Sequence, residues 1–272
     1  NPDILCNREI KFKVFFQKAI ELGADYLATG HYCQIDDQFQ LTKGADQGKD
    51  QTYFLYTLKS EILKKVMFPI GNLQKSEVRE IAKKYNLSTS SKKDSTGICF
   101  IGERNFKKFL SNYIPPSQGN FKTLNGEIVG THSGAAYYTI GQRKGLGLGG
   151  QGMPWFVLGK NIESNEVYVE RGEKHPALYF DDLIASEMSW VSGKEPNLPM
   201  NCLCKVRYRQ ADQVCTIEKI AEGKILVKFN NPQRAIATRQ SIVFYQGSIC
   251  LGGAMIESAG KSYLEMNKSV PV

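Results

Sequence analysis

Residues 1–32, NPDILCNREIKFKVFFQKAIELGADYLATGHY, contain in succession the patterns of a helix, a strand and a loop. Asn7 is a candidate amino-terminal cap for the helix, and Gly23 is a candidate stop. Residues 25–29 form a short apolar run, typical of a buried strand that delivers a loop to its carboxyl end. The order predicts an α/β layer whose ligand binds at that strand end. The apolar side chains that share one helical face are Phe12, Phe15, Phe16, Ala19, Ile20 and Leu22.

Farther along, the chain changes from helical to β-rich patterns. Residues 75–85 show a second amphipathic helical pattern, which continues the α/β layer. Asn125-Gly126 between two apolar stretches is a strong signal for a hairpin with a type I′ turn, because both turn positions need a positive φ. From there to residue 256 the segments are short, β-rich and separated by Gly, Asn or Pro. We therefore expect a small β domain followed by a β-barrel.

The length of the chain predicts more than one domain. Its 272 residues are 42% hydrophobic, whereas single domains commonly run to ~100–200 residues. The sequence opens at Asn1 rather than at a methionine, directly within a motif, so we expect a fragment. The predicted division is an α/β layer at 1–108, a central β-rich domain at 109–178, a C-terminal β-barrel at 179–258 and a loose tail at 259–272.

Charge and cysteine content suggest a cytoplasmic protein that binds nucleic acid. The formal net charge is +8 and the pI is about 9.0, which favours polyanions through phosphate contacts, although a modestly basic surface is the simpler alternative. Seven widely spread cysteines do not resemble a secreted disulfide framework. No apolar run reaches membrane-spanning length and no signal-peptide pattern is visible, so we expect no membrane partner.

Two cysteines are candidates for chemistry. Cys6 follows Asp3 by three residues and is expected just ahead of a helix, where the helix dipole would favour the reactive thiolate. Cys99 follows a segment with Lys92 and Lys93, whose charges would act in the same direction. The alternative for Cys6 is a buried structural cysteine, which is common for free thiols. Only the fold could bring residues so distant in sequence together.

Several strings together identify a family resemblance. NPDILCN, ATGHY, KDQTYFL, KKDSTGICFIGER, GQRKGLGLGG, VRYRQ and CLGGAMI occur in the order and approximate spacing of the tRNA-specific 2-thiouridylases. The resemblance covers residues 1 to about 256 of the printed chain. It implies a partial Rossmann-like layer of the adenine nucleotide α-hydrolase type, followed by the central β-rich domain and the β-barrel.

The resemblance also implies roles for the two cysteines and for residues beside them. Cys99 would carry sulfur as a persulfide received from an upstream sulfur-relay protein or cysteine desulfurase. Cys6 would be the partner thiol and close a transient disulfide with Cys99 as sulfur leaves. Asp3 would lie beside the target uridine as general acid or base, and Asn1 and Pro2 would shape the pocket of a base that has left its stack.

ATP, with Mg²⁺, is the implied co-substrate, and tRNA is the implied partner. In the family, ATP adenylates the uracil C2 oxygen, and sulfur then replaces AMP. No structural metal is expected. Gly30 would border the nucleotide, and the implied tRNA contacts are His31, Lys49, Asp50, Gln51, Arg207, Tyr208 and Gln240.

The chain departs from the family pattern in two places. The Ser-Gly-Gly-x-Asp-Ser loop that grips ATP phosphates is absent and would lie upstream of Asn1, so we expect this chain not to activate uridine alone. Thr238-Arg239-Gln240 stands where the family has a Pro-Gly-Gln turn, which bears on the Gln240 contact.

Two further motifs have other interpretations. Gly147–Gly152 matches a dinucleotide-binding spelling, but strand-like residues follow instead of a helix, so we expect a mobile basic loop or an ordinary solvent loop. Cys202, Cys204 and Cys215 lack the CxxC spacing of a zinc site, and strand alternation favours packed core cysteines.

Three functions follow as hypotheses from different classes. The first is an enzyme that transfers sulfur to the wobble uridine of tRNA. The second is a tRNA-binding module without catalysis, which would bind tRNA with a steep salt dependence. The third is a thiol–disulfide redox protein that uses Cys6 and Cys99 and is indifferent to tRNA.

Overall fold

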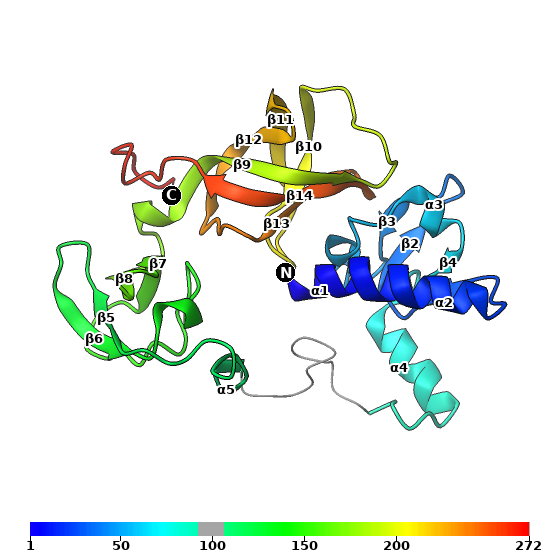
Figure 1. Cartoon of the computed structure of the whole chain (residues 1–272), viewed down its shortest axis with the longest axis horizontal. Coiled ribbons are helices and arrows are strands. Elements are labelled where there is room, and N and C mark those ends of the chain that lie inside the picture. Colours follow the sequence, from blue (N-terminus) through cyan, green and yellow to red (C-terminus); the bar gives the residue numbers. More distant parts are fainter. Residues whose placement is uncertain (92–105, 272) are drawn as a thin grey trace. The chain divides into compact units, whose positions relative to one another are not determined.

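The chain folds into two compact units. A computed structural model describes residues 1–91 and 106–271. The first unit comprises Asn1–Gly102, Ile184–Lys228 and Arg239–Glu257, and the second comprises Glu103–Leu183, Phe229–Thr238 and Ser258–Val272. Figure 1 shows the elements of both units along the chain. The finer division into a layer, a central domain and a barrel stays a prediction.

The amino-terminal helix starts earlier than the sequence predicted. α1 (Pro2–Leu5), the π-helical segment η1 (Cys6–Phe15) and α2 (Phe16–Glu21) follow one another without a break, as the blue helix of Figure 1 shows. The cap is Asn1, whose Oδ1 accepts the Asp3 amide at 3.0 Å. The predicted cap at Asn7 was wrong, because an Asn-Pro-Asp start combines a capping side chain, a proline in the first turn and an acidic residue there.

The helix ends where predicted, but its apolar face is only partly buried. Gly23 has φ +93°, and the Ala24 amide donates to the Ala19 carbonyl at 3.0 Å, which confirms the glycine stop. Phe12 is 1% exposed, whereas Phe15 is 55% exposed. A turn closed by i→i+5 bonds is wider than the 3.6-residue turn that the prediction assumed, so side chains rotate away from the expected face.

A short parallel strand pair carries the loop at the predicted ligand end. β1 (Leu27–Ala28) pairs in parallel with β4 (Val66–Met67), which confirms the strand expected at 25–29. α3 (Ser60–Leu63) precedes β4. The predicted helix at 75–85 is α4 (Lys75–Lys84), which begins with a capping box in which the Glu77 side chain accepts the Gln74 amide.

The β-barrel predicted for the C-terminal part is present. Its six strands run in the order β13-β10-β11-β12-β9-β14, and a pairing of β13 with β14 closes it. The strands are β9 (Tyr179–Trp190), β10 (Met200–Lys205), β11 (Gln213–Ala221), β12 (Lys224–Arg234), β13 (Ser241–Gln246) and β14 (Ile249–Ala259).

Within the first unit, the barrel and the α/β layer share one sheet and one core. β3 (Leu41–Lys43) adds to the edge of β14 through Thr42 opposite Ile249, and β2 (Cys33–Ile35) pairs with β3. The core that they cover joins residues of the helix, the layer and the barrel. Its members include Phe12, Leu27, Tyr53, Leu55, Val243, Tyr245 and Cys250.

The second unit contains a four-stranded sheet around a small apolar core. The strand order is β6-β5-β8-β7, with β5 (Gly119–Lys122), β6 (Ile128–His132), β7 (Trp155–Asn161) and β8 (Glu166–Arg171). Its core centres on Phe121. The unit also holds α5 (Phe106–Leu110), η3 (Ala135–Tyr137) and η4 (Pro176–Leu178).

Two sequence predictions for the second unit need correction. The hairpin at Asn125-Gly126 joins β5 to β6, but only Gly126 has a positive φ, so the turn is not type I′. The five-residue loop that closes with the Thr123 amide on the Glu127 carbonyl relaxes the requirement on Asn125. The tail was predicted to be loose, yet Tyr263 is 7% exposed and its hydroxyl donates to the Asp181 carboxylate at 2.7 Å.

No helix among the described residues is long and apolar enough to cross a membrane.

Candidate functional site

A pocket of about 410 Å³ opens at the carboxyl end of β1 in the first unit. Thr29, Gly30 and His31 follow the strand directly, as the α/β pattern predicted for a ligand site. Helix η1 forms the facing wall. The lining residues are Lys11, Phe15, Leu27, Ala28, Thr29, Gly30, His31 and Gln51.

His31 is fixed and neutral at the edge of this pocket. The ring is 9% exposed and lies 5.8 Å from the Phe12 ring and 6.0 Å from the Phe68 ring. Burial, assisted by the Lys11 charge, lowers the pKa of His31 to about 3. Its Nε2 lies 3.3 Å from the Lys11 ammonium and its Nδ1 lies 2.8 Å from the Thr29 hydroxyl.

Asp3 and Cys6 occupy the first turns of the helix that walls the pocket. Burial raises the pKa of Asp3, and the Lys11 charge opposes that shift. The Cys6 thiol is half-buried. The Cys6 amide already donates to helix carbonyls at Asp3 and Pro2, so Cys6 begins the second turn and does not precede the helix. The dipole effect predicted for its thiol is therefore weaker than at a true amino terminus.

The segment that carries Lys49, Asp50 and Gln51 is held by its own side chains. The Asp50 carboxylate is 5% exposed and accepts the Gly44 amide at 3.1 Å and the Thr52 hydroxyl at 2.8 Å. The Gln51 side chain accepts the Tyr32 amide at 3.0 Å. Asp50 therefore shapes this loop from inside, while Lys49 and Gln51 are less buried.

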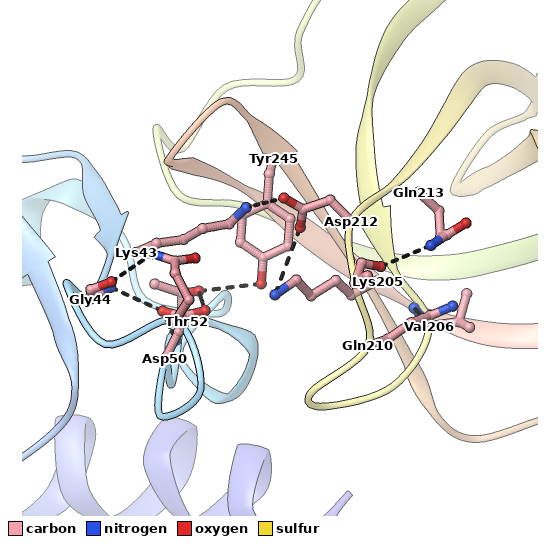
Figure 2. A network of polar contacts seen from close by, with 12 residues as sticks. Lys43, Gly44, Asp50, Thr52, Lys205, Val206, Gln210, Asp212, Gln213 and Tyr245 are labelled. Atoms are coloured by element: carbon pink, nitrogen blue, oxygen red, sulfur yellow. Dashed lines mark hydrogen bonds and ion pairs between the residues drawn. The ribbon is translucent and has the colours of Figure 1, made fainter. Parts of the chain in front are cut away.

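A buried charge network connects this segment with the barrel, as Figure 2 shows. Lys43 on β3 donates to the Asp212 carboxylate at 2.6 Å, and Lys205 on β10 lies 3.7 Å from the same group. Both ammonium groups lie over the Tyr245 ring, at 4.4 and 5.6 Å from its centroid. Tyr245 continues the network, because its hydroxyl lies 3.3 Å from the hydroxyl of Thr52.

A second connection joins the amino-terminal helix to the barrel loop at 206–212. Asn7 donates to the Phe54 carbonyl at 3.2 Å, and the Phe54 ring lies 4.3 Å from the Tyr208 ring. The Arg207 charge acts on the nearby Tyr53 hydroxyl, whose pKa burial raises. The helix that bears Cys6 therefore contacts Phe54, and the loop of Arg207 and Tyr208 contacts the same residue through the Tyr208 ring.

The turn at Thr238-Arg239-Gln240, where the family has Pro-Gly-Gln, has the backbone conformation that glycine favours. Arg239 has φ +66°, and its amide donates to the Ile256 carbonyl at 2.9 Å. The Gln240 carbonyl accepts the Ile256 amide at 2.8 Å. Because the arginine adopts the left-handed conformation that glycine favours, the turn that presents Gln240 is formed without a glycine.

Comparison with known proteins identifies the family. Family models match residues 1–103 (tRNA methyl transferase HUP domain), 107–171 (tRNA methyl transferase PRC-barrel domain) and 180–256 (Aminomethyltransferase beta-barrel domain). The tRNA-specific 2-thiouridylase MnmA of Protochlamydia amoebophila is 61% identical over 275 residues, covering 100% of this chain and 73% of that protein. The protein of the same name from Staphylococcus carnosus is 56% identical, with 96% and 72% covered.

The chain belongs to the tRNA-specific 2-thiouridylase family. Membership confirms the resemblance read from the sequence strings, and the three matched domains confirm the predicted fold class. The roles of individual residues in this thiouridylase chain stay predictions. Among them, Cys99 lies outside the described residues.

The structure of this thiouridylase brings together two groups of predicted residues. Asp3, Cys6, Gly30, His31 and Gln51 belong to the pocket or to the helix that walls it. Arg207 and Tyr208 adjoin the same helix through Phe54.

Sequence reasoning missed the residues that position those groups. Lys11 follows Asp3 and Asn7 at helical spacing, a signal that could have placed it on the same face. Lys43 and Asp212 are 169 residues apart, and no local pattern joins them.

The glycine-rich loop at 147–152 and the barrel cysteines each contact neighbouring side chains. Gly147–Gly152 precedes strand β7, as predicted, and Arg171 donates to the carbonyls of Gly149 and Met153 at its base. The Cys202 and Cys215 sulfur atoms lie 3.6 Å apart on paired strands of the barrel.

Proposed function

We propose that this chain belongs to an enzyme that carries out ATP-dependent transfer of sulfur from a protein persulfide to C2 of the wobble uridine of tRNA. One observation supports the proposal most strongly. The helix that bears Asp3 and Cys6 lines a pocket at a strand end and also contacts, through Phe54, the loop of Arg207 and Tyr208. A reactive pocket and an RNA-binding loop on one helix suit an enzyme that acts on a single nucleotide of a large RNA.

We infer the following order of chemistry. ATP, with Mg²⁺, would supply the adenylyl group that makes the uracil C2 oxygen a leaving group, and pyrophosphate would be released; Gly30 would border the nucleotide. The terminal sulfur of the Cys99 persulfide attacks C2, and AMP departs with the oxygen. The Cys6 thiolate then attacks the Cys99 sulfur, which forms a Cys6–Cys99 disulfide and releases 2-thiouridine. A thiol reductant restores both cysteines.

Asp3 is the proposed proton carrier for these steps. Burial raises its pKa, which brings a carboxyl group nearer to the pH at which it can both take and return a proton. Asn1 caps the same turn and holds the Asp3 backbone, and Pro2 fixes the first helical position. Asn1 and Pro2 therefore shape the base pocket rather than exchange protons.

The proposed tRNA contacts come from the layer and from the barrel. Lys49 and Gln51 act from the layer, where His31 lies at the edge of the pocket, and Arg207, Tyr208 and Gln240 act from the barrel. Asp50 contributes through the conformation of its loop, because its carboxylate is engaged within the chain. An arginine beside an aromatic ring combines phosphate pairing with a stacking surface.

A sulfur-relay protein as donor and a cytoplasmic location belong to the same proposal.

The test uses the full-length protein that contains this chain, with its tRNA, ATP and a persulfide donor. Cys99→Ser and Cys6→Ser should each abolish formation of 2-thiouridine, measured by mass spectrometry of nucleosides. Cys202→Ser is the matched control, because Cys202 is also half-buried but lies in the barrel wall. Normal thiolation by Cys99→Ser would contradict the proposal.

The alternatives give other outcomes in the same experiment. A non-catalytic tRNA-binding module would bind tRNA with a steep salt dependence in every variant and form no 2-thiouridine. A thiol–disulfide redox protein would exchange with small thiols through Cys6 and show no dependence on tRNA.

A further inference from the structure

Lys11 presents a positive charge to the pocket at the carboxyl end of β1. It lies on helix η1, on the same side as Asp3, and its side chain lines the pocket together with Gly30 and Gln51. Its Nζ lies 3.3 Å from His31 Nε2. Within residues 1–91 and 106–271, it forms no salt bridge with a carboxylate.

The hydrogen bonds around His31 define how Lys11 is held. A lysine ammonium can only donate, so His31 Nε2 accepts from Lys11. The single ring proton of the neutral imidazole is then on Nδ1, which donates to the Thr29 hydroxyl at 2.8 Å. Both ring nitrogens are used, and the ring packs in one aromatic cluster with Phe12 and Phe68. His31 is therefore a rigid acceptor that aims the ammonium at the pocket.

A neutral partner orients a cation without cancelling its charge. Lys43 and Lys205 differ in this respect, because both are paired with Asp212. Lys13, on the same helix as Lys11, is paired with Glu9 at 2.8 Å. Among the described residues Lys11 has no carboxylate at salt-bridge distance, and Asp3 interacts with it only through space. Its ammonium lies beside a loop that ends a parallel strand, an arrangement that suits an anion.

We propose that the Lys11 ammonium binds a phosphate oxygen of the substrates in this pocket. The inference rests on the proposed function, in which both substrates carry phosphates as their anionic groups. Two sources share this chemistry: the α-phosphate of the adenosine nucleotide near Gly30, and a backbone phosphate of tRNA beside the extruded uridine. In either case Lys11 is a binding residue of the reaction, and His31 is its positioning residue.

The test compares Lys11→Gln, Lys11→Arg and the control Lys13→Gln in the 272-residue chain. Lys13→Gln removes one charge from the same helix, but from an exposed pair. Binding is measured with AMP, with adenosine, and with a tRNA anticodon stem-loop over a range of salt concentrations. A lost charge-assisted hydrogen bond to phosphate should raise the Kd of Lys11→Gln roughly 10-fold or more.

The ligands separate the two sources. If the phosphate belongs to tRNA, Lys11→Gln lowers the magnitude of the salt slope for the stem-loop by about 1 and leaves AMP binding unchanged. If it belongs to the nucleotide, AMP binding falls while adenosine binding and the RNA salt slope stay as in wild type. Lys11→Arg keeps the charge and should remain within roughly threefold of wild type in both cases.

Three results would overturn the inference. The first is Lys11→Gln binding AMP and RNA as Lys13→Gln does. The second is an equal loss of adenosine and AMP affinity, which would indicate a structural effect independent of phosphate. The third is Lys11→Arg losing affinity as fully as Lys11→Gln. Wild-type chain that binds the stem-loop no better than an unrelated RNA hairpin would instead contradict the proposed function, so the two failures are distinguishable.

Discussion

Asp212→Asn removes the only carboxylate that the described structure places between Lys43 and Lys205, and it isolates the stabilising effect of the network in Figure 2. The Lys43 side chain is 5% exposed and that of Lys205 is 11% exposed, so neither ammonium is well hydrated. The asparagine keeps the size of the side chain but leaves both charges buried without a counter-charge. The variant should therefore unfold more easily.

The expected loss is about 2 kcal/mol in the free energy of unfolding. Breaking a fully buried pair costs about 3–5 kcal/mol, and Asp212, which is 32% exposed, allows water to replace part of that interaction. The Tyr245 ring, 4.4 Å from the Lys43 ammonium, also retains some attraction for the cation. For a chain of this size, such a loss lowers the Tm by roughly 4–8 °C.

Urea unfolding monitored by circular dichroism measures this change. Glu218→Gln is the matched control, because it removes the exposed pair with Lys228 and should cost less than about 1 kcal/mol. A loss for Asp212→Asn equal to that of Glu218→Gln would refute the claim that a buried network joins the layer to the barrel.

Three further predictions concern single residues of the first unit. Burial lowers the folded-state pKa of His31 to about 3, whereas the unfolded state titrates near 6.5, so the stability that neutral His31 contributes is present above pH 6.5 and is lost as the pH falls toward 3. His31→Gln should therefore flatten the dependence of the unfolding free energy on pH in that window, and urea unfolding at pH 4.5 and 7.5 measures this change. Arg239→Gly should raise unfolding free energy by about 0.5–1 kcal/mol, because glycine adopts φ +66° without a side-chain penalty; a decrease would contradict the strain argument. Phe54→Ala should weaken binding of the anticodon stem-loop by roughly 10-fold through loss of the Tyr208 contact, measured by fluorescence anisotropy at fixed salt, and unchanged affinity in a folded variant would separate Tyr208 from RNA binding.

Local sequence signals predicted the elements that local forces determine. The stop at Gly23, the strand before Gly30 and the helix at α4 each depend on residues a few positions apart. The start of the helix was predicted wrongly, because Asn7 directly precedes the apolar pattern, whereas the helix is capped at Asn1, ahead of that pattern. The π-helical stretch was not predictable, because its wider turn depends on packing rather than on residue type.

The sequence likewise predicted only part of the candidate site. Family strings located Asp3, Cys6 and His31, but the contacts that hold them join distant parts of the chain. Asn7 meets Phe54 across 47 residues, and no periodicity or motif encodes that approach. Contacts of this kind follow from the tertiary fold, so the positioning residues appear only in the structure.

The proposed sulfur transfer oxidises one pair of cysteines for each uridine that is thiolated. In a single turnover, full-length protein preloaded with persulfide at Cys99 is mixed with tRNA and ATP without reductant. Nucleosides and non-reduced peptides are then quantified by mass spectrometry. We expect one Cys6–Cys99 disulfide for each 2-thiouridine formed, and 2-thiouridine that accumulates with Cys6 still a thiol would contradict the proposed mechanism.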